Sequence, residues 1–265
     1  MGAPRTTGGL VEISREGHLA TIALVRPERR NVLDAETATA LREAAEALAA
    51  DREVRCAILT GTGDVFAAGA DINEIEAAED RENLAYNRQM RAAANAVAGL
   101  PMPSIAALNG HAVGGGLELA LACTLRVAAA GAKLGLPEVR LGIIPATGGL
   151  ARLPRLIGTA RAARLLLTGE LIDGAAAERL GLVDAVAPDG AGALAEARAL
   201  AARIAAAAPL ATRAVVAALR EDAGRSIADA NVRAEDRLAG LLASADRREG
   251  AAAFLERREP RFEGR

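Results

Sequence analysis

The segment NGHAVGGGLELALACT (residues 109–124) places three consecutive glycines directly before an apolar stretch with helical character. A single glutamate, Glu118, lies two positions after the last glycine, Gly116. Glycine weakens a helix, and an unpaired carboxylate is costly to bury. Both features at one junction indicate a role beyond forming a helix.

Gly114, Gly115 and Gly116 follow a buried strand that the apolar run at residues 104–110 predicts. Glycines at a strand-to-helix junction let backbone N–H groups approach a ligand, and the first helical turn adds unsatisfied N–H donors. Such donors can bind phosphate or an oxyanion that forms during a reaction. The alternative is that the glycines only allow the helix to pack closely on the strand. The G-x-G-x-x-G dinucleotide spacing is absent.

Size and composition narrow the class of protein. A chain of 265 residues can form one large domain, or a main domain with an appendage. A net charge of −2 and an aromatic content of 2% argue against nucleic-acid binding. The apolar surroundings of Cys56 and Cys123 predict buried free thiols, and two histidines with two separated cysteines predict no metal site.

No targeting or membrane segment is expected. Residues 1–12 lack the apolar core of a signal peptide, and no uninterrupted apolar run reaches membrane-spanning length. These features predict a soluble, cytoplasmic protein.

Strands alternate with helices over the first two thirds of the chain, which predicts an α/β core with βα crossovers. The pattern indicates a hairpin turning at Gly17 and a helix that Asp34 caps and that runs to about Ala50. Residues 65–70 are expected to be loop and to turn helical after Asp71. Further elements are expected as strands at 54–61, 124–129 and 132–138 and a helix at 81–99.

The character of the chain changes after Pro188. Residues 191–257 are almost entirely helix-forming, with breaks near Pro209 and Gly224. This pattern predicts a separate helical layer. Its apolar faces are expected to pack against a partner subunit, or alternatively on the protein's own core.

Two glutamates are candidates for acid–base chemistry. Glu118 lies one turn into the predicted helix, and Glu138 follows a proline at the end of a predicted strand. Taken singly, each is more typical of a solvated or helix-capping acid. Together they suggest a carboxylate pair for general acid–base work, although spacing alone does not bring them together.

Three motifs, in this order, carry a family resemblance: FAAGADI (66–72), GHAVGGGLELALAC (110–123) and LGLPEVRLGIIPATGG (134–149). With these motifs the whole chain closely resembles the enoyl-CoA hydratase/isomerase (crotonase) superfamily. The resemblance implies an α/β fold, a crotonase-like spiral of ββα turns with a helical C-terminal trimerisation region. It implies a spiral core at residues 1–190 that carries the active site and an oligomerisation region at 191–265. It also implies a homotrimer or a hexamer built as a dimer of trimers.

The resemblance implies a coenzyme A thioester as substrate. The residues themselves predict no permanently bound cofactor, no metal and no nucleic-acid or membrane partner. Members that hydrate enoyl thioesters carry two glutamates at positions that match Glu118 and Glu138. The oxyanion hole would be formed by the N–H groups of Ala70 and Gly115. The remaining substrate-binding positions would be Ala68, Asp71, Ile72, Asn73 and Gly114.

The implied activity is that of an enoyl-CoA hydratase of fatty acid metabolism, which adds water to a trans-2-enoyl-CoA to give a 3-hydroxyacyl-CoA. One alternative is another superfamily reaction, above all Δ3-Δ2-enoyl-CoA isomerisation, which needs one carboxylate. An alternative of a different class is a non-catalytic acyl-CoA-binding subunit. Retention of both glutamates with the oxyanion motif argues against this last alternative.

The sequence departs from the family pattern in three places. PATGGLARL (145–153) replaces two polar side chains by Leu150 and Ala151, Thr124 stands where an aspartate is common, and Leu136 is apolar where some hydratases have glutamine. These departures leave the acyl preference open. Arg29 and Arg30 are expected either to contact the CoA phosphates or to be solvated.

Overall fold

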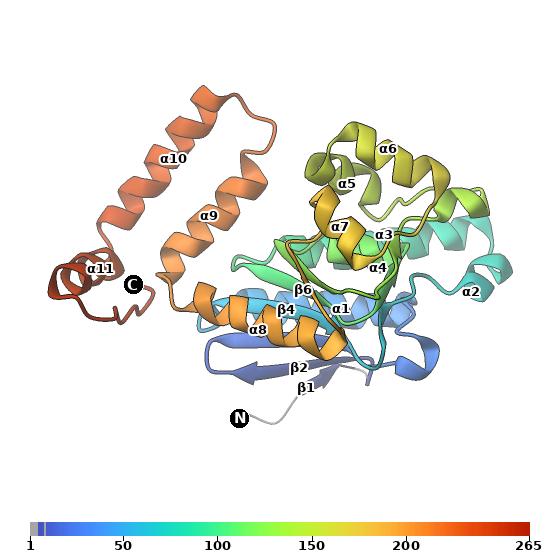
Figure 1. Ribbon diagram of the computed structural model, residues 1–265, viewed down its shortest axis with the longest axis horizontal. Coiled ribbons are helices and arrows are strands. Elements are labelled where there is room, and N and C mark those ends of the chain that lie inside the picture. The colour runs from blue at the N-terminus through green and yellow to red at the C-terminus, as the bar shows by residue number, and fades with distance from the viewer. Residues whose placement is uncertain (1–4, 8) are drawn as a thin grey trace.

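The computed structural model describes residues 5–7 and 9–265, and within them the chain builds two sheets (Figure 1). In the larger sheet the strand order is β1-β2-β3-β4-β6-β8-β10, and from β3 onward every neighbouring pair is parallel. The smaller sheet is parallel with the order β5-β7-β9. The larger sheet comprises β1 (Arg5–Thr7), β2 (Val11–Glu16), β3 (Leu19–Leu24), β4 (Cys56–Gly61), β6 (Ser104–Leu108), β8 (Leu125–Ala129) and β10 (Ala185–Ala187). The smaller comprises β5 (Val65–Ala67), β7 (His111–Val113) and β9 (Leu134–Gly135).

The chain winds as a spiral between these sheets. Each turn adds a strand to the larger sheet, then a short strand to the smaller one, and returns through helical or turn structure to the next parallel position. The pairs β4/β5, β6/β7 and β8/β9 are three successive turns of this kind. The predicted spiral of ββα turns is therefore confirmed, and so is the hairpin, which turns at Gly17 with φ of 57°.

The helices predicted after Asp34, after Asp71, at residues 81–99 and after the triple glycine are confirmed, whereas the three core helices between residues 149 and 180 were not predicted. The Asp34 carboxylate accepts a hydrogen bond from the N–H of Thr37 at 2.8 Å, and this cap starts α1 (Ala35–Ala50). α1 packs against α3 (Asp80–Ala98), while α2 (Ile72–Ala77) begins after Asp71 as expected. The other core helices are α4 (Gly115–Ala120), α5 (Gly149–Ile157), α6 (Thr159–Thr168) and α7 (Gly174–Leu180).

Two local predictions are wrong, and both concern the smaller sheet. The expected strand at 132–138 is confined to Leu134–Gly135, because Pro137 cannot donate to a strand ladder and Glu138 starts a 3-10 turn, η2 (Glu138–Leu141). Residues 65–67 form a strand rather than a loop. Strands of two or three residues are too short to show alternation in a sequence.

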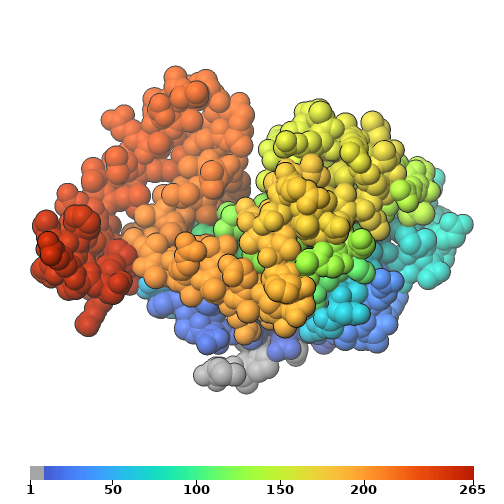
Figure 2. Space-filling model, in the orientation of Figure 1, coloured from blue at the N-terminus to red at the C-terminus, as the bar shows by residue number. Residues whose placement is uncertain are grey.

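The C-terminal helices divide into one that lies on the sheet and three that extend away from it. α8 (Gly190–Ala205) packs on β4, β6 and β8 with Ala193, Ala197 and Ala201 buried. α9 (Pro209–Glu221), α10 (Ile227–Leu242) and α11 (Ala245–Glu256) form an arm beside the body (Figures 1 and 2). The breaks near Pro209 and Gly224 are confirmed, and a further break lies at Ser244. The division of the chain at residue 190, and the oligomer-forming role of residues 191–265, stay predictions; residues 1–4 and 8 of the expected core lie outside the described part.

No single helix among the described residues is long and apolar enough to cross a membrane. Only α8 and α9 taken together are long and apolar enough, and the chain bends by 112° between them.

Two arginines join the arm to the body. The Arg55 guanidinium, from the segment before β4, donates to the carbonyl oxygens of Ala205 at 3.3 Å and Phe262 at 2.7 Å. Arg213, on α9, donates back to the carbonyl oxygen of Val54 at 3.2 Å. The end of α8, the start of the arm and the C-terminal tail therefore converge on one short segment of the body.

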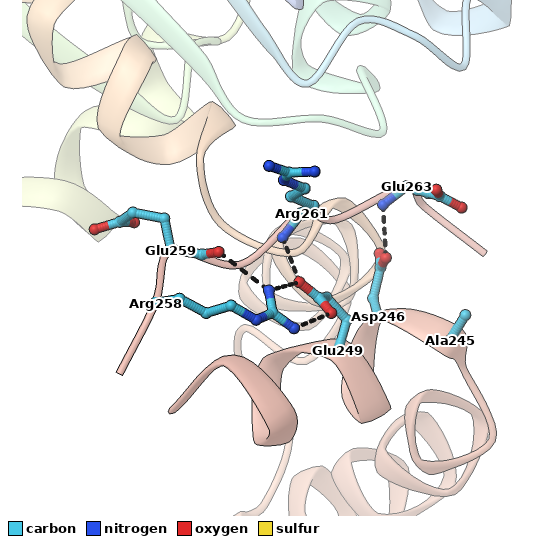
Figure 3. A pocket seen from close by; sticks show the side chains of 7 residues that line it. All are labelled: Ala245, Asp246, Glu249, Arg258, Glu259, Arg261 and Glu263. Carbon is cyan, nitrogen blue, oxygen red and sulfur yellow. Dashed lines mark hydrogen bonds and ion pairs between the residues drawn. The ribbon is translucent and has the colours of Figure 1, made fainter. Parts of the chain in front are cut away.

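Two carboxylates hold the C-terminal tail against α11, around a cavity of about 720 Å³ (Figure 3). Asp246 is 3% exposed and accepts hydrogen bonds from the N–H groups of Glu263 at 2.7 Å and Gly264 at 2.9 Å. The Glu249 carboxylate accepts two hydrogen bonds from Arg258, at 2.6 and 2.9 Å, and this pairing lowers the pKa of Glu249 to about 2. The charged groups of this cavity therefore bind the C-terminal tail and are not free to bind a ligand.

We expect Asp246→Ala to loosen the tail, because two amide groups lose a charged acceptor at a buried position. Hydrogen bonds to charged groups contribute about 1.5–3 kcal/mol each, so the free energy of unfolding should fall by about 2–4 kcal/mol. Urea unfolding at fixed protein concentration measures this. Glu235→Ala, at an exposed position of α10, is the control and should change stability by less than about 0.5 kcal/mol. Equal stability of the two variants would contradict the assignment.

Candidate active site

Three site residues follow the ends of the three strands of the smaller sheet. Ala70 lies three positions after β5, Gly115 two positions after β7, and Glu138 three positions after β9. The carboxyl ends of parallel strands meet at one edge of a sheet, where ligands of open α/β sheets commonly bind. The parallel alignment of β5, β7 and β9 therefore gathers these residues.

A cavity of about 670 Å³ lies at this edge, and Ala70, Gly115, Glu118 and Glu138 all line it. The structure thus brings together the four residues that the sequence assigned to acid–base chemistry and to the oxyanion hole. The rest of the lining comes mainly from α3 and from the segment 142–147, and the latter contributes Gly142, Ile143, Ile144, Ala146 and Thr147.

The three consecutive glycines meet three different constraints. A Cβ on Gly116 would lie 2.2 Å from the carbonyl oxygen of Ala67, so this glycine allows α4 to pack against β5. Gly114 has φ of 54° and ψ of −127°, a conformation that residues with a side chain avoid. A Cβ on Gly115 would meet only ordinary contacts, the nearest being Leu33 at 3.7 Å. Close packing therefore explains Gly116, whereas Gly115 leaves open space at the cavity wall.

The backbone amides of Ala70 and Gly115 lie in adjacent segments of that wall. The ideal Cβ position of Gly69 is 3.4 Å from the nitrogen of Gly115, and that of Gly115 is 4.0 Å from the nitrogen of Ala70. Gly115 is the first residue of α4, so its N–H has no partner within the helix. Within the described residues, neither amide donates to another protein group. Two free N–H donors side by side are what an oxyanion hole requires.

Glu118 is fixed by the start of α5. It is 3% exposed, and its Oε1 accepts hydrogen bonds from the N–H groups of Thr147 at 2.9 Å and Gly149 at 2.7 Å. Burial raises the pKa of Glu118, and these two donors oppose that rise by stabilising the charged form. The result is a positioned carboxylate that is more basic than one in water.

Glu138 is also buried, but it lacks the pair of backbone donors that stabilise the charged form of Glu118. It is 9% exposed, its Oε1 lies 3.2 Å from the ideal Cβ position of Gly114, and its Oε2 has no hydrogen-bond partner among the described residues. Burial raises the pKa of Glu138 to about 7, and the charge of Glu118 contributes to the rise. The two carboxyl groups therefore differ in environment, which is how acid and base roles are commonly separated.

The other predicted substrate-binding residues lie outside the cavity lining. Asp71 caps α2 by accepting from the N–H of Asn73 at 3.0 Å, and it forms an ion pair with Arg29. Ile72 is half exposed, and the N–H of Ala68 donates to a main-chain oxygen at 3.1 Å. Roles for Ala68, Asp71, Ile72, Asn73 and Gly114 in binding coenzyme A stay predictions.

Several side chains that the sequence singled out have structural partners. Arg29 pairs with Asp71 and lies near two further carboxylates, which leaves little free positive charge for a phosphate. The Nδ1 of His111 accepts a hydrogen bond from the N–H of Lys133 at 2.9 Å, as expected of a satisfied edge imidazole. Thr124 exchanges hydrogen bonds with Ser104, because the backbone N–H of each residue donates to the hydroxyl oxygen of the other.

Sequence reasoning missed the apolar wall of the cavity. Leu84 and Met90 reach it from α3, and Ile143 and Ile144 reach it from the segment after η2. The signal for the α3 side was weak, because that helix reads as highly charged. Leu136 does not line the cavity but is buried against the start of α5. Among the described residues, no group of three or more histidine, cysteine, aspartate or glutamate side chains is placed to hold a metal ion.

A model of the enoyl-CoA hydratase/isomerase family matches residues 14–265. The chain belongs to the enoyl-CoA hydratase/isomerase family. This places it in the crotonase superfamily, as the motifs predicted.

Relatives of this family span nearly the whole chain. A bovine protein, enoyl-CoA hydratase domain-containing protein 2 of mitochondria, is 43% identical over 93% of this chain and 84% of its own length. The enoyl-CoA hydratase/isomerase YngF of Bacillus subtilis is 41% identical over 93% of this chain and 95% of its own. Among solved structures, an enoyl-CoA hydratase from Bacillus anthracis superposes with a TM-score of 0.94 at 35% identity, covering 97% of this chain and 100% of that one.

The glycine constraints make opposite predictions for neighbouring positions. Gly116→Ala should destabilise the protein by more than about 3 kcal/mol, because its Cβ has no space beside β5. Gly115→Ala should fold with a stability within about 1 kcal/mol of wild type, yet lose activity, because the methyl group intrudes beside the two amides. Thermal unfolding and turnover of enoyl thioesters check both. An active, stable Gly116→Ala variant would refute this packing.

Stability should depend on the protonation of Glu138. A folded-state pKa of about 7, above the ordinary 4.5, means that the folded protein holds a proton that the unfolded chain releases. Stability is therefore lost as pH rises from about 4.5 to about 7. The full shift corresponds to roughly 3 kcal/mol, and solvent access to the cavity reduces this to about 2 kcal/mol.

Glu138→Gln removes this titration, so we expect the variant to exceed wild type in stability by about 2 kcal/mol at pH 8.5 and by little at pH 5. Urea unfolding at both pH values is the measurement. Glu178→Gln, on the exposed face of α7, provides a matched control with no pH-dependent difference. A constant offset between Glu138→Gln and wild type across this range would show that Glu138 is not protonated in the folded state at neutral pH.

Proposed function

We propose that this protein is an enoyl-CoA hydratase, which adds water across the C2–C3 bond of a trans-2-enoyl-CoA to give a 3-hydroxyacyl-CoA. The observation that carries the proposal is that two differently held carboxyl groups, Glu118 and Glu138, line one cavity with two backbone amides that donate to no other group among the described residues. Family membership supports a thioester of coenzyme A as the substrate.

The amides of Ala70 and Gly115 act on the thioester carbonyl. Water attack at C3 moves negative charge through the conjugated system onto the carbonyl oxygen, as in an enolate. Two preorganised N–H donors stabilise that charge, and removal of one such donor typically lowers the rate by about 10²–10³. The same polarisation makes C3 electrophilic before attack.

The two glutamates move the protons. Glu118, whose Oε1 accepts hydrogen bonds from the N–H groups of Thr147 and Gly149, accepts a proton from the attacking water. Glu138, protonated up to about pH 7, donates its proton to C2. One O–H bond of water and the C2–C3 π bond break, while C3–O and C2–H bonds form. Glu118 then releases its proton to solvent and Glu138 takes one up, so the net change is the addition of one water molecule. The reaction requires no permanently bound cofactor.

The proposed active form is a homotrimer, or a hexamer of two trimers. The arm supports such an assembly by exposing large apolar side chains, among them Ile227, Leu238 and Phe254. A monomer seldom leaves such an apolar surface uncovered.

Activity of Glu118→Gln and Glu138→Gln tests the mechanism. Each variant should lower kcat on a trans-2-enoyl-CoA by at least about 10²-fold, because each removes one proton transfer. In wild type, kcat/KM should fall about tenfold per pH unit above pH 7, as Glu138 loses its proton. Glu178→Gln is the control and should retain wild-type activity.

Near wild-type hydration by both glutamine variants would disprove the mechanism. Isomerisation of a trans-3-enoyl-CoA without hydration of the 2-enoyl isomer would assign the chain to the isomerase branch. Binding of acyl-CoA with no turnover of either isomer would indicate a non-catalytic subunit.

A further inference from the structure

Arg152, on α5, lies near Glu118 but outside the lining of the active-site cavity. It is the fourth residue of α5, and its half-buried side chain turns back toward the start of the helix, as helical side chains commonly do. There its Nη1 donates to the carbonyl oxygen of Thr147 at 3.3 Å. The N–H of Thr147 donates to Glu118, so a single residue connects the guanidinium to the carboxylate.

The peptide unit between Thr147 and Gly148 extends this connection. The carbonyl of Thr147 and the N–H of Gly148 belong to one planar trans peptide, so they point in opposite directions and fixing one fixes the other. Burial raises the pKa of Glu118, and the N–H groups of Gly149, Thr147 and Gly148 oppose that rise. By holding the Thr147 carbonyl, Arg152 therefore orders donors that favour the charged form of Glu118.

Gly148 leaves the space that the guanidinium occupies. A Cβ on Gly148 would lie 1.9 Å from Nη1 of Arg152 and 2.9 Å from its Cζ. Gly148 also has φ of 137°, a conformation that residues with a side chain rarely adopt. The other nitrogen, Nη2, donates to the Oδ1 of Asn95 on α3 at 2.8 Å. The guanidinium is thus held by α3, by the Gly148 backbone and by the Thr147 carbonyl.

The start of a helix is an unfavourable place for a cation. The helix dipole favours acidic residues there, yet the first turn of α5, GLAR (149–152), contains none. Burial lowers the pKa of Arg152, the charge of Glu118 opposes that effect, and the neighbouring Arg155 adds a like charge. Glu118 is therefore the anion that compensates Arg152, and it comes from a different helix, α4.

The other titratable groups near Glu118 carry no positive charge. Burial raises the pKa of Glu138 in η2 and of the Tyr86 hydroxyl on α3, and the charge of Glu118 adds to both shifts. Cys123, which lies near Arg152, is a buried thiol whose pKa burial also raises. Of the groups that face Glu118 in the described part of the chain, Arg152 is thus the one whose charge stabilises a carboxylate.

We propose that Arg152 is a positioning residue for the hydration reaction: it holds the start of α5 against Glu118 and keeps this glutamate a carboxylate that can accept a proton from water. The inference rests on the proposed function, in which Glu118 is the base. Because Arg152 lies outside the cavity lining, it acts on the substrate only through Glu118. Its loss should therefore lower kcat and leave KM unchanged.

Steady-state kinetics with a four-carbon trans-2-enoyl-CoA test the assignment. Arg152→Gln should lower kcat by about tenfold, because a base that is held less firmly is misplaced for attack, and KM should stay within about twofold of wild type. Arg152→Lys keeps the charge and a donor for Thr147, so it should recover most of the loss. Arg155→Gln makes the same change at an exposed position of α5 and should keep wild-type kcat.

Two further readouts separate positioning from a purely structural role. In a Glu118→Gln background, Arg152→Gln should lower kcat by less than about twofold, because the group that it positions is absent. In the wild-type background, Arg152→Gln should move the acid limb of kcat/KM, where Glu118 gains its proton, to higher pH by about one pH unit. Charged Glu118 then lacks a cation and ordered donors. Arg155→Gln should leave this limb in place.

Three results would overturn the assignment: an equal loss of kcat with and without Glu118, an acid limb that does not move, or Arg152→Lys as impaired as Arg152→Gln. If the wild-type protein hydrates no enoyl thioester, the proposed function fails instead. The carboxyl ¹³C resonance of Glu118, assigned by its absence in Glu118→Gln, then tests the inference alone. Its titration midpoint should lie at higher pH in Arg152→Gln than in wild type, and equal midpoints would refute the role of Arg152.

Discussion

The close approach of α4 to β5 is the contact on which the site depends. Gly116 faces the carbonyl oxygen of Ala67 with no space for a side chain, so the first turn of α4 lies directly against the end of a strand from the preceding turn of the spiral. That approach brings the amide of Gly115 beside the loop of Ala70 and directs Glu118 into the cavity. The absence of a side chain at Gly116 thereby sets the distance between the amides of Ala70 and Gly115, which are 45 positions apart in the chain.

Burial then separates the two carboxyl groups chemically. Both lose solvation, which favours the neutral form, but only Glu118 receives two backbone donors at the start of a helix. Glu138 follows a proline in a 3-10 turn and has an oxygen without a partner among the described residues. Backbone donors therefore oppose the rise in pKa at Glu118, whereas burial and the charge of Glu118 both raise the pKa of Glu138.

Much of this arrangement could be predicted from the sequence, because its motifs are local. The triple glycine, the cap at Asp34 and the helix breaks at Pro209 and Gly224 act within a few residues, and the family pattern assigned Glu118 and Glu138. The strands β5, β7 and β9 are too short for periodicity, so the sequence could not show that they align the site. The apolar wall was missed because it joins two distant segments, and the hydroxyl pair of Thr124 with Ser104 was missed for the same reason.

The anchoring of the arm has a consequence for how the molecule opens. Arg55 donates to the end of α8 and to the C-terminal tail, while Arg213 donates back to the segment before β4, a buried strand of the larger sheet. Local opening of the tail must break hydrogen bonds that also order the edge of that strand. Amide hydrogen exchange in the C-terminal tail and in β4 should therefore be correlated. The arm and the core would then open as one cooperative unit, although the arm extends away from the core.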